Sequence, residues 1–141
     1  MTSRLVQRAV LIYLTLAGTL VGAWAAFFPR SFYDDFPGLG RAWVAVDGSY
    51  NEHLVRDVGQ LNLALALVSL VAAVTMQRLL VRVAAAAWLL DAVPHFVYHL
   101  RHLSAYGTAD KIGNIASLAL LALLPAGVLA ASWREGREPA G

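Results

Sequence analysis

The 141-residue sequence contains no cysteine. This absence excludes disulfide bonds, thiolate metal sites and cysteine nucleophiles, and it leaves the redox compartment undetermined. Charged residues are also scarce, since they make up 14% of the chain against roughly a quarter of a typical soluble domain. Hydrophobic residues make up 59%, and the mean hydropathy is +0.60. The composition therefore predicts an integral membrane protein with a single domain.

The sequence also lacks any cluster of basic residues. A net charge of +2 and a pI near 9.3 would suit a nucleic-acid partner, but the 11 lysines and arginines are scattered singly beside the apolar segments. Binding to a phosphate backbone needs such residues gathered in a stripe or patch. We therefore expect no nucleic-acid partner, and we attribute the basic residues to membrane topology.

Four long apolar segments are present. Each is long enough to cross roughly 30 Å of hydrocarbon as a helix, so the lipid bilayer is an expected partner. Together they predict an all-α fold, a four-transmembrane-helix bundle in residues 1–133, followed by a polar cytoplasmic tail over residues 134–141. The predicted helices cover approximately residues 5–28, 51–77, 81–103 and 110–133.

The first segment has a cleaved signal peptide as its main alternative interpretation. Two arginines precede the apolar run, and residues 23–25, Ala-Trp-Ala, resemble a small-x-small cleavage site. The uncharged run continues beyond that site to Phe28, so we expect a retained helix. Gly18 and Gly22 form a small-xxx-small pair, which allows a neighbouring helix to approach closely.

An aromatic-rich interfacial loop is expected between the first two helices. Prolines, glycines and aspartates interrupt regular structure over residues 29–52. Seven of the chain's 14 aromatic residues lie between residues 27 and 50. Two interpretations stay open, namely a belt of rings at headgroup level or a lid over a cavity between the helices.

An even number of spans places both termini on one side of the membrane. We expect this side to be the cytoplasm, because the shortest loop, residues 77–82, is basic, whereas the long first loop also carries acidic residues. The expected location is the plasma membrane, which is the inner membrane of a bacterium.

The third apolar segment contains a row of ionisable residues, Asp91, His95, His99 and His102. On a helix they point at about 0°, 40°, 80° and 20°, so they share one face. An acid and three imidazoles facing lipid would be costly, so we expect this face to meet protein, water or a ligand. Asp91 lies roughly 16 Å from His102 along the axis, near the middle of the bilayer.

The second helix begins with another polar stripe, which consists of His53, Asp57 and Gln60. Antiparallel helices joined by a short turn usually pack side by side. We therefore expect the two stripes to face each other and, together with Tyr98, to line a polar cavity that opens on the non-cytoplasmic side. The simpler alternative is that Asp91 pairs with Arg56 or with a histidine and holds the helices together.

Three functions fit such a cavity. The first is ligand binding. Histidines four residues apart can bind one transition metal, and carboxylates can complete its coordination. A small lipophilic molecule is the other ligand that we expect. The candidate metal ligands are His53, Asp91, His95 and His99. Haem is a variant, with His53 and either His95 or His99 as axial ligands. The second is acid/base chemistry on a lipophilic substrate. The third is an accessory or structural subunit, in a homo-oligomer or in a larger membrane complex.

Architecture and short motifs give a family resemblance. The first helix ends in Phe27-Phe28-Pro29, and after the loop Arg56-Asp57-Val58-Gly59-Gln60-Leu61-Asn62-Leu63-Ala64 opens the second helix. With two further helices, this order resembles the DoxX-like small four-helix membrane proteins over most of the chain. The resemblance implies the four-helix fold and, for some members of that group, an association with quinone-linked or oxidative-stress membrane complexes. It implies no role for the histidines of the third helix.

Overall fold

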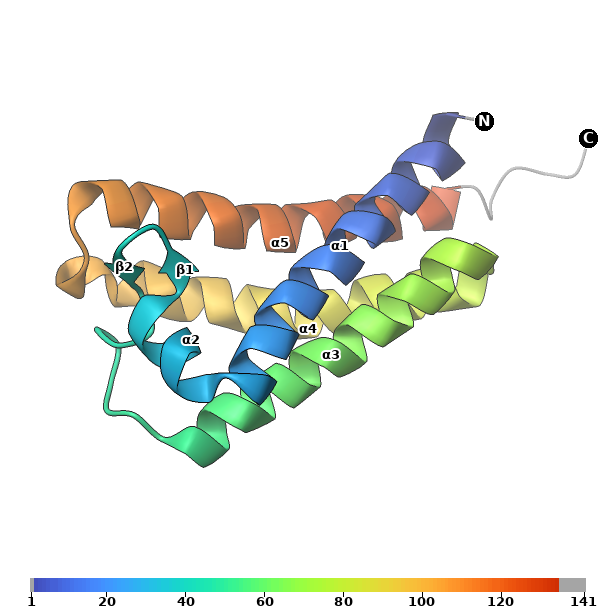
Figure 1. Cartoon of the computed structure of the whole chain (residues 1–141). Coiled ribbons are helices and arrows are strands. Elements are labelled where there is room, and N and C mark those ends of the chain that lie inside the picture. The colour runs from blue at the N-terminus through green and yellow to red at the C-terminus, as the bar shows by residue number, and fades with distance from the viewer. Residues whose placement is uncertain (1, 135–141) are drawn as a thin grey trace, which may run out of the picture.

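The computed structural model describes residues 2–134 (Figure 1). Its elements are α1 (Thr2–Phe27), α2 (Pro29–Asp35), β1 (Pro37–Gly38), β2 (Arg41–Ala42), α3 (Glu52–Thr75), α4 (Arg78–Arg101), the 3₁₀ turn η1 (Leu103–Ala105) and α5 (Thr108–Arg134). Helices α1, α3, α4 and α5 are each long and apolar enough to cross a membrane. The predicted all-α, four-helix integral membrane fold is therefore confirmed. The predicted tail lies outside the described residues, except for Arg134.

The four long helices form two antiparallel pairs. α1 packs along α3, and α4 packs along α5 (Figure 1). The start of α1 and the end of α5 lie at one end of the bundle, which we call the terminal end, and α2 and the hairpin lie at the other, which we call the loop end. The turn between α3 and α4 is at the terminal end, where Met76 adopts a left-handed backbone conformation with φ of 49°.

Glycines set the contact between α1 and α3. A Cβ built on Gly22 would lie 2.8 Å from the backbone nitrogen of Leu63, and one built on Gly59 would lie 2.3 Å from that of Ala26. No side chain fits at these distances, so the two backbones meet directly, as expected for a small-xxx-small pair. The contact also fixes the rotation of α3, whose buried residues are Val55, Gly59, Ala66, Ser69, Ala72 and Ala73.

The larger apolar core lies at the terminal end. Side chains from all four long helices meet there, among them Leu11, Ala73, Val81 and Val128. Nearer the middle of the bundle, the indole N–H of Trp88 donates a hydrogen bond of 2.7 Å to the buried hydroxyl of Ser69, which joins α4 to α3. Toward the loop end α3 and α4 diverge (Figure 1). α3 and α4 are thus close together at the terminal end and apart at the loop end.

The aromatic segment between α1 and α3 covers the loop end. The ring of Phe36 packs on Trp24 of α1, with centroids 6.0 Å apart. The indole N–H of Trp43 donates to the carboxylate of Asp110 at the start of α5 (2.8 Å), and Arg41 forms an ion pair with the same carboxylate. The segment therefore connects α1 to α5 through a short helix and a hairpin.

Candidate functional site

The polar row of the third spanning helix lies on the loop-end half of α4. The buried residues of this helix end at Ala92. Asp91, His95, Tyr98 and His102 are exposed, and His99 is half-buried. Leu90, Val93, Val97 and Leu100 are exposed on another side of the same helix. This half of α4 therefore presents one polar face and one apolar face outside the core.

The rings of this row contact one another. The centroids of His95 and His99 lie 4.7 Å apart, and those of Tyr98 and His102 lie 4.1 Å apart with an angle of 19° between the planes. The Nδ1 atom of His102 also lies 2.8 Å from the carbonyl oxygen of Tyr98, and it donates a hydrogen bond there when it carries a proton. The three imidazoles and the phenol are thus ordered along the helix surface.

His99 lies beside Tyr106 of the loop end, with 6.3 Å between the ring centroids. Its Nδ1 atom is buried, and no described residue forms a hydrogen bond with it. The Tyr106 hydroxyl donates a hydrogen bond of 2.9 Å to the carbonyl oxygen of Trp43. Burial, reinforced by the negative charge of Asp47, raises the pKa of Tyr106 to about 12. The phenol therefore stays protonated at neutral pH and remains a donor.

Asp91 has no partner among the residues that the structure describes, since none of them forms a hydrogen bond or ion pair with its carboxyl group. The alternative pairing with Arg56 does not form, because Arg56 forms an ion pair with Glu52 (2.9 Å) and donates to the carbonyl oxygen of Ala26. Asp91 lies about 20 Å from the start of α4, near the middle of the span. Exposure of a carboxyl group at this depth is costly unless something covers it.

The polar stripe at the start of α3 points away from α4. His53 is 88% exposed and contacts Asp57, with 3.3 Å between Nε2 and Oδ2, and Gln60 is exposed as well. The buried residues Val55 and Gly59 lie on the opposite face of the helix. This corrects the expectation that the two stripes face each other across one cavity. The backbone contact between Gly59 and α1 sets the rotation of α3 and turns the stripe outward.

The predicted metal ligands do not form a complete site within one chain. Among residues 2–134, no three His, Asp or Glu side chains are grouped so that they could hold one ion. The structure brings His95 and His99 together, and Asp91 precedes His95 by one turn, but His53 lies on the outward face of α3. The metal site, and haem held between His53 and α4, therefore stay predictions.

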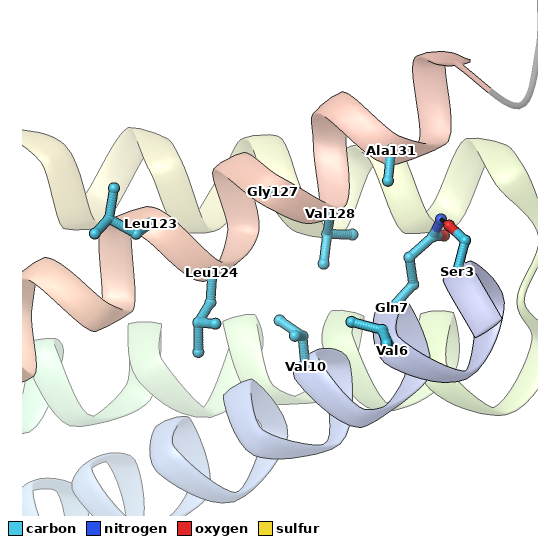
Figure 2. Close-up of a pocket in the computed structure, with 9 residues that line it drawn as sticks. All are labelled: Ser3, Val6, Gln7, Val10, Leu123, Leu124, Gly127, Val128 and Ala131. Atoms are coloured by element: carbon cyan, nitrogen blue, oxygen red, sulfur yellow. Dashed lines mark hydrogen bonds between the residues drawn. The ribbon is translucent and has the colours of Figure 1, made fainter.

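A groove that sequence patterns did not indicate lies between α1 and α5 at the terminal end (Figure 2). Its volume is about 480 Å³, and aliphatic side chains such as Val10, Leu124 and Val128 line most of it. Gln7, which is only 4% exposed, also lines it. Valines and leucines at helical spacing are typical of any spanning helix, so they gave no signal. Gly127 was the one hint of a groove in the sequence, because a glycine has no side chain to fill the space beside it.

The chain matches no protein-family model, no curated protein and no solved structure. Its function is therefore inferred from two features of the molecule, the exposed polar face of α4 and the groove between α1 and α5.

Proposed function

We propose that the protein is an accessory or structural subunit of a membrane assembly, and that it associates through the polar face of α4 with a second copy of this chain. The Asp91 carboxyl group carries the proposal, because it is exposed near the middle of a spanning helix and no described residue pairs with it. Such a group is more stable against protein than against lipid. The resemblance to DoxX-like proteins, some of which belong to membrane complexes, is in keeping with this role.

The polar face of α4 is complementary to itself. Asp91 and His95 lie one helical turn, roughly 6 Å, apart along the same face. When two copies meet with their α4 helices parallel around a two-fold axis, each carboxyl group lies one helical turn from the height of the other copy's His95. The side chains can span this offset, and the two-fold symmetry then forms the contact twice. An acid and an imidazole form a charge-assisted hydrogen bond, which is stronger than a neutral one. This reciprocity favours a second copy over an unrelated partner.

The remaining residues of α4 fit the same interface. Ala87, one turn before Asp91, is small and permits close approach of a second helix. Tyr98 offers an exposed ring with a polar tip, a residue type that is common at interfaces. Leu90 and Val93, which are exposed on the other side of α4, suit contact with lipid. One side of the helix is therefore suited to protein and the other to the bilayer.

Stoichiometry in a bilayer tests this proposal. Native mass spectrometry of the wild-type protein released from lipid nanodiscs is expected to show a dimer. Asp91→Leu is expected to be monomeric, because it removes both reciprocal pairs and also the cost of exposing the acid to lipid. Asp57→Leu is the matched control, because it removes the acid of a similar acid and imidazole pair on the outward face of α3, and it is expected to remain dimeric. A monomeric wild type, or a dimer that persists in Asp91→Leu, would contradict the proposal.

A metal site completed by two copies is a second candidate. It is favoured by the adjacent rings of His95 and His99, because two chains would together supply four imidazoles, and four ligands are what a tetrahedral zinc site requires. Elemental analysis of the purified dimer is expected to find zinc, and His95→Ala with His99→Ala is expected to remove it. A metal-free dimer would exclude this candidate and leave the assembly role intact.

A further inference from the structure

The groove between α1 and α5 adjoins a second, smaller hollow at the terminal end. Gln7 lines both of them. Polar side chains line much of the hollow, including Arg4, Arg78 and Ser132. Figure 2 shows Gln7 and Ser3 at one end of the groove, and aliphatic side chains along the rest of its length. The two concavities therefore adjoin at Gln7, and the groove is apolar whereas the small hollow is more polar.

The apolar part suits a hydrocarbon chain. Its volume of about 480 Å³ lies within the roughly 300–1,000 Å³ of ligand pockets. Leu124 and Val128 point into it from α5 (Figure 2). A Cβ built on Gly127 would meet no atom within 4 Å, so this glycine leaves open space. Val6 and Leu123 are exposed at the edges of the groove, which therefore opens sideways, toward the lipid of the bilayer.

The polar part suits an anion. Within residues 2–15, 70–85 and 125–134, which make up the described part of the terminal end, there is no Asp or Glu, whereas there are five arginines, Arg4, Arg8, Arg78, Arg82 and Arg134. Arg8 donates to the carbonyl oxygen of Ala73 (3.1 Å), and Arg82 donates to that of Ser132 (2.8 Å). Arg4 and Arg78 line the hollow itself. Positive charge at a membrane surface attracts anionic lipid.

We propose that this is a binding site for one anionic phospholipid. An acyl chain lies in the groove. The hollow itself has a volume of only about 10 Å³, so the phosphate lies outside it, at the surface, against the exposed side chains of Arg4 and Arg78. Gln7 lies where the groove and the hollow meet. Charge complementarity at the polar end selects an anionic headgroup, and the length of apolar groove beyond it selects a lipid over a free phosphate. The site lies at the opposite end of the molecule from the polar face of α4, so the two proposals stand or fail separately.

Lipid retention by the full-length protein tests the headgroup part. Nanodiscs of equimolar phosphatidylglycerol and phosphatidylcholine are the probe, and native mass spectrometry identifies the lipids retained on release. The wild type is expected to retain phosphatidylglycerol in preference. Arg4→Gln with Arg78→Gln is expected to reduce this preference about 30-fold, because each arginine near an anionic surface contributes roughly a factor of five. Arg30→Gln with Arg101→Gln, at the loop end, is the matched control and is expected to change nothing.

Filling the groove tests the acyl-chain part. A Cβ at Gly127 meets no atom within 4 Å, and leucine is a better helix former than glycine, so Gly127→Leu is expected to keep the fold while its side chain occupies the groove and retention of the lipid is lost. Ala130→Leu, exposed on the same helix and outside the groove, is expected to retain lipid. Equal retention of both lipids by the wild type, or normal retention by Gly127→Leu, would overturn the proposal. Complete displacement by inorganic phosphate would also overturn it, because only the anion would then be recognised.

Discussion

A Cβ on Gly59 would lie 2.3 Å from the backbone nitrogen of Ala26, so α1 and α3 meet backbone to backbone at this point. The contact fixes both the separation and the relative rotation of the two helices. It thereby determines which residues of α3 face outward, and His53 and Gln60 are among them.

Gly59→Ala is expected to lower the free energy of unfolding by roughly 1–3 kcal/mol, the usual cost of overpacking, although alanine is the better helix former. Gly127→Ala is the matched control, because its Cβ would meet no atom within 4 Å, and it is expected to be as stable as the wild type or slightly more stable. Unfolding in detergent measures both variants. If Gly59→Ala unfolds like the wild type, the direct contact between the helices is refuted.

Tyr106 is expected to make the folded protein lose stability at alkaline pH. Its pKa rises from the ordinary value of 10.0 to about 12 in the folded state, so folding holds the phenol proton more tightly. The stability that results is complete below pH 10 and is lost as the pH rises toward 12. Tyr106→Phe carries no such proton and is expected to lose less stability over the same range. Unfolding curves recorded at several pH values give the comparison, and parallel losses in the two proteins would rule the effect out.

The carboxylate of Asp110 is expected to hold the aromatic segment on α5. It accepts a hydrogen bond from Trp43 and pairs with Arg41, so Asp110→Ala releases the segment from this side. Backbone hydrogen exchange over residues 36–47 is expected to become faster in this variant. Asp34→Ala, which breaks an ion pair within α2, should leave exchange over residues 36–47 unchanged. Unchanged exchange in Asp110→Ala would mean that other contacts hold the segment.

The positions of the helices could be predicted because a bilayer demands long uncharged segments, and the predicted ranges 51–77 and 81–103 end within a few residues of α3 and α4. The rotation of α3 could not be predicted. Helical periodicity tells which residues share a face, but not which neighbour that face meets, and here the answer depends on Gly59 meeting Ala26 of another helix. The groove beside Gly127 likewise depends on how α1 packs against α5, and the residue pattern of either helix alone does not predict this packing.

Cysteine cross-linking on α4 tests the central claim most directly, because the chain has no cysteine of its own. Ala87→Cys places a thiol on the polar face, one turn before Asp91, and Val93→Cys places one on the apolar face. In membranes treated with an oxidant, dimerisation through the polar face predicts a disulfide-linked dimer for Ala87→Cys. It predicts that this dimer is lost when Asp91→Leu is added, and that Val93→Cys forms no disulfide-linked dimer. A monomeric Ala87→Cys protein, or equal cross-linking from both faces, would contradict it.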